Sequence, residues 1–525
     1  MTKGRWRYWL AAELLAAAVL LSGCSWTGED APASSAERHP PVVVVVFDEF
    51  PADDLLGPDG QIDAERFPNF AELASISTWF PNAHTQYDST FKAVPSILDG
   101  RLPKRGTAPD VRSHKPSVFH LMDRLGYEVF KVESASAVCP PDICPGARTR
   151  RPGVLKRLSG GGRPARFHHW LGQVRRRARP AFYFHHALLP HEPWIYLPSG
   201  RQSRPAGEDP VLHINHDVGF GDPDLTVHNH LRHLLQVAYT DHLVGELLAR
   251  LRRTGLLERA LLVVTADHGY SFRVGVKSRR LISDRNVEEI APVPLFVKAP
   301  GQTEGKLDRS LASNIDIVAT VADLLGTRVF YRQDGRSVFS GAVRARREIA
   351  VRTRDFRHVV RIGPRELARR RAGRRALWAR QFGTGAGSEL LYGDPWRRAY
   401  DIGPHRELIG RRVAALSVSS PGQAPGAERA SVANAALFSA VSLHERLFPT
   451  RVTGPLHGVP VGEHRDLALA VNGRIQATGR SFDLAQPRRE FFSFMLPESV
   501  VRSGANRLEL FELRPGGELV RVGGV

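Results

Sequence analysis

The sequence predicts an α/β fold in which helices cover both faces of a mostly parallel central sheet, followed by a small β-rich domain at the C-terminus. Residues 42–47 form a run of five valines and a phenylalanine between turn-forming residues, which is typical of a strand buried on both faces. Similar apolar runs follow at residues 181–186, 261–266 and 294–298, and helical patterns lie between them at residues 234–251 and 315–325. Buried strands that alternate with amphipathic helices indicate a layered α/β domain.

The 525 residues divide by composition into a large domain and two later parts. We expect the large domain over residues 41–345. Residues 346–450 are rich in Arg, Gly and Pro, which predicts a peripheral Arg-rich extension. The remaining part, residues 451–525, contains short alternating segments that predict the β-domain, at residues 466–472, 474–482, 490–496 and 506–513.

The N-terminus has the features of an export signal. Two arginines precede an apolar stretch that ends in Leu-Ser-Gly before Cys24. These four residues resemble the bacterial lipobox, which implies lipidation at Cys24 and a lipid anchor; a single membrane anchor and a plain secretory signal are the alternatives for residues 1–24. Residues 25–40 are predicted to be a linker. All three alternatives place the body of the protein outside the cytoplasm, and a lipid anchor would hold it at the cell membrane.

Two further cysteines, Cys139 and Cys144, lie in the Pro-rich segment Cys-Pro-Pro-Asp-Ile-Cys. In an exported protein this spacing predicts a local disulfide that stiffens a surface loop. The net charge of +19 could attract an anionic partner, although solvated basic surface is the simpler interpretation. No zinc-finger spacing or aromatic RNA-binding strand is present, so we expect no nucleic-acid partner.

The strongest chemical signal is the segment Thr265-Ala266-Asp267-His268-Gly269, which follows an apolar strand. An adjacent carboxylate and imidazole at the carboxyl end of a strand are natural ligands for a divalent cation. Asp48 and Glu49 end the first strand in the same way. Because side chains alternate along a strand, we expect only one of these two acids to bind the metal, and we favour Asp48 over Glu49.

A third segment, residues 85–101, completes a pattern. Together with the acid at the strand end and the Asp-His-Gly turn, it resembles the sulfatase-like enzymes of the alkaline phosphatase superfamily, over residues 41–340. True sulfatases have an oxidisable Cys or Ser where this chain has Ala93, whereas Thr90-x-x-x-Val-Pro resembles the nucleophile segment of phosphoethanolamine transferases and lipoteichoic acid synthases. The resemblance implies an alkaline-phosphatase-like sandwich and a Thr90 nucleophile that also contacts the metal. Ser89 is the alternative nucleophile.

Histidines supply the remaining candidates. Pro190-His191-Glu192-Pro193 resembles the stretch in which sulfatase-like enzymes place a histidine near the leaving oxygen, so we expect His191 or Lys92 to stabilise charge there. His185 and His186 are interpreted as strand histidines. A His-rich segment allows a second metal ion, at His213, His216, His228, His230 and His233.

The sequence therefore predicts an enzyme that hydrolyses or transfers phosphoric esters, including phosphodiesters, with a covalent Thr90 intermediate and one divalent ion (Mn, Mg, Zn or Ca). The substrate would be an anionic ester in the envelope or outside the cell, such as a lipid or cell-wall polymer. A sulfuric ester hydrolase is the first alternative. The second alternative is a non-catalytic envelope protein that binds anionic polymer.

Overall fold

A computed structural model of the chain describes residues 39–525 except 134, 146–161, 206–220, 277, 420–428, 486–487 and 524–525. The predicted export signal with Cys24 therefore lies outside the described residues, as do His213 and His216. Among the helices that are described, none has an apolar stretch long enough to cross a bilayer.

The large domain is built on a seven-stranded sheet in the order β3-β4-β1-β5-β6-β2-β7. Only β6 runs antiparallel to its neighbours, so the predicted mostly parallel sheet is confirmed. The strands are β1 (Val42–Asp48), β2 (Thr78–Trp79), β3 (Glu128–Val132), β4 (Ala181–Pro190), β5 (Leu261–Ala266), β6 (Leu295–Lys298) and β7 (Lys306–Leu307).

Strand register brings three strand ends to one edge of this sheet. Val42 in β1 pairs with Phe182 in β4 and with Leu261 in β5, and these three strands are parallel. They therefore advance in step, so Asp48 lies beside the ends of both neighbours. A register shift between Phe47 and Asp48 ends the regular pairing at this point. In sheets of this kind, polar groups at the carboxyl ends of strands form the functional site.

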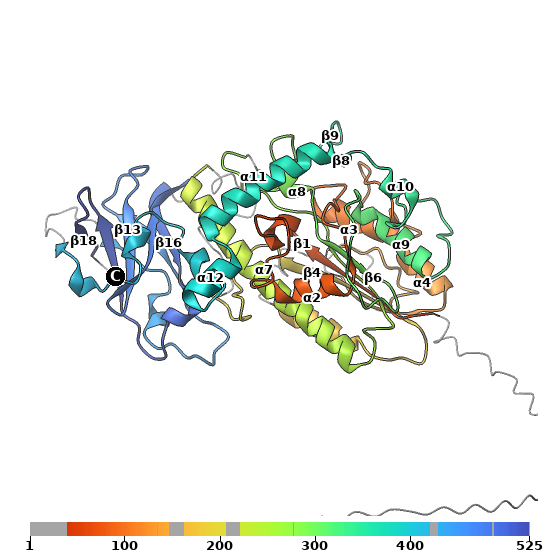
Figure 1. The fold of residues 1–525 in the computed structure, drawn as a ribbon, viewed down its shortest axis with the longest axis horizontal. Coiled ribbons are helices and arrows are strands. Elements are labelled where there is room, and N and C mark those ends of the chain that lie inside the picture. The colour runs from red at the N-terminus through yellow and green to blue at the C-terminus, as the bar shows by residue number, and fades with distance from the viewer. Residues whose placement is uncertain are drawn as a thin grey trace, which may run out of the picture.

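Both faces of β1 are buried, which explains its unbroken valine run. Val43 and Val45 face one core cluster, and Val42 and Val44 face the other. The first face is covered by α2 (Pro68–Ser75), α6 (Arg163–Gln173) and α7 (Pro223–Arg253), and the second by α3 (Thr90–Asp99), α4 (Val118–Arg124) and α9 (Ile317–Leu324). Figure 1 shows the sheet between these layers.

Helix α7 begins 11 residues before the helical pattern seen in the sequence. Asp222 caps it, since its carboxylate accepts a hydrogen bond from the Leu225 N–H at 2.8 Å, and Pro223 occupies the first turn. The early part of α7 carries His228, His230 and His233, all buried. Buried polar residues hide the apolar periodicity on which a helix prediction depends.

The C-terminal part consists of two sheets at one end of the molecule (Figure 1). Five strands pair in the order β10-β18-β17-β13-β14, and four in the order β11-β12-β16-β15. The strands are β10 (Val418–Ser419), β11 (Arg429–Ala430), β12 (Arg451–His457), β13 (Asp466–Val471), β14 (Arg474–Arg480), β15 (Phe482–Ala485), β16 (Arg488–Met495), β17 (Leu508–Leu513) and β18 (Leu519–Arg521). The β-rich domain thus takes two edge strands from the predicted extension, and strands of two residues are too short to show alternation in a sequence.

The rest of the Arg-rich extension is packed against the large domain. It forms the hairpin β8 (Ile349–Arg352) and β9 (Val359–Ile362), then α11 (Pro364–Phe382) and α12 (Gly385–Tyr392); the short helices α8 (Val287–Ile290) and α10 (Gly341–Arg344) precede it. Arg371 is buried, and its guanidinium lies 2.8 Å from Asp53 Oδ1. Arg374 lies 2.8 Å from Glu289, which is also buried. Part of the basic excess is therefore neutralised inside the protein.

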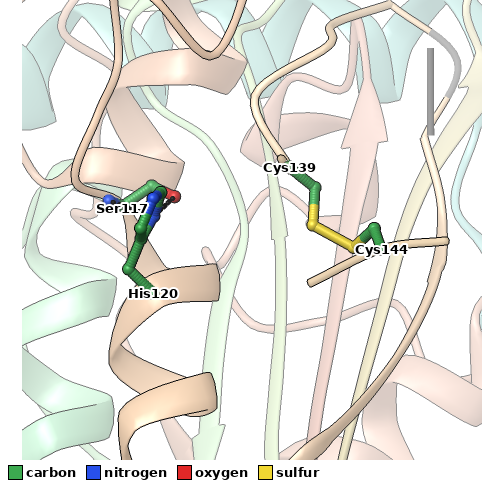
Figure 2. The surroundings of a disulfide bond; sticks show 4 residues. All are labelled: Ser117, His120, Cys139 and Cys144. Carbon is green, nitrogen blue, oxygen red and sulfur yellow. Dashed lines mark hydrogen bonds between the residues drawn. A yellow bond between two sulfur atoms is a disulfide. The ribbon is translucent and has the colours of Figure 1, made fainter. Parts of the chain in front are cut away.

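Cys139 and Cys144 form the expected disulfide, with Cα atoms 6.1 Å apart (Figure 2). Both residues are buried in the second core cluster, so the bond lies under the surface rather than in an exposed loop. Figure 2 also shows Ser117 and His120, which form a capping box at the start of α4. The disulfide fixes the chain after β3 against the same core that packs on α4.

Candidate active site

Two strand ends and one helix N-terminus bring four of the predicted site residues together. Asp48 is the last residue of β1, Thr90 the first of α3, and Asp267 and His268 follow β5 directly. All four residues are buried. Residues separated by more than 200 positions thus meet at one edge of the sheet.

Thr90 lies at the centre of this group. Its hydroxyl donates to Asp48 Oδ1 at 3.2 Å and lies 3.3 Å from His268 Nε2. Ser89, the alternative nucleophile, is the N-cap residue of α3, and within the described residues its side chain makes no hydrogen bond to the group. The geometry therefore favours Thr90 over Ser89 as the hydroxyl aimed at the site.

The best arranged donor set for a cation is Asp48, His186 and Asp267. Their ligand atoms all lie within 4.8 Å of one another. His186 Nε2 and Asp267 Oδ2 are buried and have no hydrogen-bond partner. A buried polar group without a partner costs free energy, and a bound cation would satisfy both atoms at once. Oxygen and imidazole donors fit a divalent ion.

His186 is a strand histidine, as the sequence predicts, and it also faces the candidate metal site. It lies in β4 opposite Val46, which comes two residues before Asp48 in β1. Its Nδ1 lies 3.0 Å from Glu133 Oε1, and its Nε2 lies 3.7 Å from Asp48 Oδ2. A carboxylate on one imidazole nitrogen orients the other toward a metal. A hydrophobic strand run gives no sign of this role.

The neighbouring carboxylates shift the pKa values of Asp48 and His186. Burial and the neighbouring Asp267 raise the pKa of Asp48 well above its usual range. Burial lowers the pKa of His186, but the charges of Glu133, Asp48 and Asp267 outweigh it and raise that pKa to about 9. Two buried carboxylates side by side repel each other, so the group gains from any positive charge placed between them.

His268 and Asp267 are held by backbone contacts. Asp267 Oδ1 accepts hydrogen bonds from the N–H groups of His268 at 2.6 Å and Glu49 at 3.2 Å. His268 Nδ1 lies 2.9 Å from the Gly269 carbonyl, so Nδ1 carries the hydrogen and Nε2 faces Thr90 with its lone pair. Gly269 is required here because a Cβ would lie 2.4 Å from the Glu289 carbonyl oxygen.

Glu49 belongs to a separate group of charged residues. Its backbone turns into the left-handed region at φ 60°, and its carboxylate lies 3.3 Å from both Arg279 and Arg280 and 3.4 Å from His191 Nε2. Arg279 also lies 2.5 Å from Glu192. These arginines hold the pKa of Glu49 below its usual value against the opposing effect of burial. The structure thus directs Asp48 and Glu49 into different groups, and it does so through the left-handed backbone of Glu49 after the end of β1 rather than through strand alternation.

Two predicted catalytic residues take different places. His191 lies beside Glu49, and burial lowers its pKa to about 3, so the imidazole is neutral. Lys92 does not reach the group: its ammonium donates to the Lys104 carbonyl at 2.8 Å and to the Thr107 hydroxyl at 2.8 Å. Because Lys92 lies two residues after Thr90 on a helix, its side chain points to a different face.

The arginines nearest the site, Arg279 and Arg280, were not identified from the sequence, since they lie in a loop without a motif.

Comparison with known proteins finds one family match and several more distant similarities. The sulfatase family profile matches residues 165–327. Choline-sulfatase of Rhizobium meliloti (strain 1021) is 25% identical over 361 residues, which cover 55% of this chain and 68% of the relative. Residues 165–327 therefore match the sulfatase family, and a longer, weaker similarity to a choline-sulfatase extends over more than half of the chain.

Other similarities are shorter or structural. Arylsulfatase K of Bos taurus is 32% identical over 89 residues, which cover 17% of this chain and 16% of the relative, so this sulfatase-like chain spans a small part of that protein. Among solved structures, the phosphonate monoester hydrolase of Silicibacter pomeroyi has a TM-score of 0.43 at 17% identity, over 59% of this chain and 79% of that one.

Proposed function

We propose that this sulfatase-superfamily hydrolase acts on phosphoric esters, as a hydrolase or a transferase, with Thr90 as its covalent nucleophile. The observation that carries the proposal is the Thr90 hydroxyl, 3.2 Å from Asp48 and 3.3 Å from His268, beside the donor set of Asp48, His186 and Asp267. A hydroxyl in this position can attack an ester bound at the same edge of the sheet.

The covalent step uses groups already in contact. The Thr90 oxygen forms a bond to phosphorus as the bond from phosphorus to the leaving oxygen breaks. The Thr90 proton passes to Asp48 Oδ1 or to His268 Nε2, its two neighbours, and the departing alkoxide takes a proton from solvent water, so that the leaving group departs as the alcohol. A water or an acceptor alcohol then attacks phosphorus and releases Thr90 as a hydroxyl.

A divalent ion fits the donor set of Asp48, His186 and Asp267, with Thr90 and His268 beside it. When bound, the ion lowers the pKa of the hydroxyl and shields the negative charge of the ester from the nucleophile. The protein contributes the orientation of these donors, through Glu133 on His186 and the backbone N–H groups on Asp267.

Arg280 is the best placed cation for the non-bridging oxygens. Its guanidinium lies 3.3 Å from Glu49, and its charge acts on both Asp48 and Asp88. About a fifth of its side chain is exposed, whereas Arg279 is almost fully buried between Glu49 and Glu192. Arg279 therefore positions the acids, and Arg280 is available to a ligand.

A sulfuric ester hydrolase is the second candidate, since the chain resembles a choline-sulfatase over more than half its length. Ala93 favours phosphoric esters over sulfuric esters as substrates, because this residue cannot be oxidised to the aldehyde that the sulfatase pattern requires. A non-catalytic polymer-binding role is less consistent with the Thr90 geometry.

We also propose an extracytoplasmic location with a lipid anchor at Cys24. The Leu-Ser-Gly-Cys motif supports it, and so does the disulfide between Cys139 and Cys144, because such bonds persist in oxidising compartments. A lipid or cell-wall ester would then lie within reach of the enzyme.

A paired assay tests the function. Purified protein is incubated with manganese and either an aryl phosphodiester or the matching aryl sulfate, and the Thr90→Ala variant is measured beside it. We expect turnover of the phosphodiester, a rate at least about 10³-fold lower for Thr90→Ala, and partial activity for Thr90→Ser. Faster turnover of the sulfate, or full activity of Thr90→Ala, would overturn the proposal.

A further inference from the structure

The tip of the β8–β9 hairpin, residues 353–358, lies against the segment that carries Thr90. The Arg352 N–H donates to the Gln86 carbonyl at 3.3 Å, and the Tyr87 hydroxyl donates to the Arg354 carbonyl at 3.1 Å. The rings of Tyr87 and Phe356 lie 5.0 Å apart. The hairpin belongs to the Arg-rich extension, so a segment more than 260 residues away in sequence borders the candidate nucleophile.

Asp88 connects this tip with the loop of Arg279 and Arg280. Arg354 Nε lies 3.5 Å from Asp88 Oδ1, and Arg354 Nη2 donates to the Asp88 carbonyl at 3.3 Å. The other carboxylate oxygen of Asp88 accepts from the Ile282 N–H at 3.1 Å. Asp88 is fully buried and stands two residues before Thr90. Arg354 and Arg280 therefore approach the nucleophile from two different loops.

Arg354 is oriented so that part of its guanidinium is left for a ligand. Its Nε and Nη2 face Asp88, and within the described residues Nη1 makes no hydrogen bond. The side chain is 41% exposed, about twice the value for Arg280. A guanidinium has five N–H donors in a planar fork, which suits an oxyanion bound along its outer edge.

Anchoring the hairpin does not by itself require this arginine. The main-chain bond to Gln86, the Tyr87 hydroxyl and the contact between Tyr87 and Phe356 all hold the tip without the Arg354 side chain. Arg105 also donates to the Asp355 carbonyl at 2.6 Å. The surroundings are basic as well, since Lys104, Arg105 and Arg357 are exposed near the tip.

We propose that Arg354 forms an anion subsite next to the reacting centre and binds a second anionic group of the substrate. The proposal rests on the function proposed above: Arg280 meets the reacting ester, and Arg354, farther out and more exposed, meets the next charge along the molecule. The substrate class is then an ester that carries a second phosphate or sulfate group, such as a chain of repeating anionic esters.

Arg354→Gln tests this subsite, and Arg357→Gln is its matched control. Arg357 has the same charge and lies in the same tip, but its side chain makes no contact with Asp88 among the described residues. Dextran sulfate is the probe, and its binding to the full-length protein is measured by fluorescence anisotropy at 50 mM and 200 mM salt. This measurement requires no turnover, so it can succeed or fail independently of the proposed activity.

We expect Arg354→Gln to weaken binding of dextran sulfate about tenfold at 200 mM salt, and Arg357→Gln to change it by less than about twofold. Arg354→Lys, which keeps the charge, should recover part of the loss even if the Gln variant folds poorly. Equal weakening by both Gln variants would mean general attraction to a basic surface and would overturn the subsite, as would unchanged binding in Arg354→Gln.

Discussion

Two neighbouring acids at the end of β1 have opposite electrostatic surroundings. Asp48 lies among Asp267, His186 and the Thr90 hydroxyl, and its pKa is raised by burial and by the second carboxylate. Glu49 is equally buried, but Arg279 and Arg280 lie 3.3 Å from its carboxylate and hold its pKa low. The group around Asp48 therefore lacks positive charge, whereas in the group around Glu49 the arginines balance the carboxylates.

Although Asp48 and Glu49 are adjacent in sequence, the first lies in the candidate cation site and the second in a group of ion pairs. The left-handed backbone of Glu49 and the end of regular strand pairing at Asp48 direct the two side chains into different groups. An acid in the first group should be needed for metal binding, and an acid in the second should be needed for protein stability. Paired substitutions can separate these roles.

The largest expected effect distinguishes Asp48→Asn from Glu49→Gln. Asp48→Asn should lose metal binding and at least about 10³-fold in rate, because an amide is a poor ligand for the cation that the group requires. Glu49→Gln should bind metal normally but melt at a lower temperature, since Arg279 loses a buried partner. Metal content by mass spectrometry and thermal melts measure the two effects. Equal metal loss in both variants would contradict the separation.

The second effect concerns the ion pairs beyond this site. Arg371→Ala should destabilise the protein by about 3 kcal/mol, because it leaves Asp53 short of a buried partner. The matched control is Arg369→Ala on the same helix, where the side chain is 74% exposed and pairs with Glu366. That change should leave the free energy of unfolding nearly unchanged, because solvent screens an exposed ion pair. Denaturant titration gives both values, and equal losses would mean that α11 is held by something other than Asp53.

Much of this arrangement could be predicted from the sequence. The valine run of β1 and the Asp267-His268-Gly269 turn carry local signals, and both take the expected places. His186 could not be recognised, because the contact that orients it comes from Glu133, 53 residues earlier. The docking of α11 was missed for a similar reason: a run of arginines predicts a solvated surface, and only the fold brings Asp53 and Glu289 against it.

A smaller effect should follow from loss of the Glu133 contact. Glu133→Gln should weaken metal affinity about 10- to 100-fold while leaving the bound stoichiometry at saturation unchanged. Glu128→Gln, in the same strand β3 and only half-buried, is the control and should have no effect on the metal. Isothermal titration with manganese measures both variants. A normal affinity in Glu133→Gln would exclude His186 from the metal site.

The smallest expected effect is a pH dependence of protein stability that comes from Asp54. Burial would raise the pKa of Asp54, but hydrogen bonds with His230 and His233 outweigh it and lower that pKa to about 2. A carboxyl with a lowered folded pKa stabilises the protein above its unfolded value, and this contribution is lost as the pH falls through about 4 toward 2. The free energy of unfolding of wild type should therefore be about 2 kcal/mol higher than that of Asp54→Asn at pH 6. The difference should be smaller near pH 3. Asp59→Asn, at an exposed site, should differ little from wild type at either pH.

Anomalous diffraction from crystals grown with manganese tests the central claim most directly. The account predicts one strong peak bounded by the side chains of Asp48, His186 and Asp267, within reach of the Thr90 hydroxyl, and no peak beside Glu49. A fully loaded protein whose manganese lies elsewhere, with His186 and Asp267 turned away from it, would contradict the proposed site.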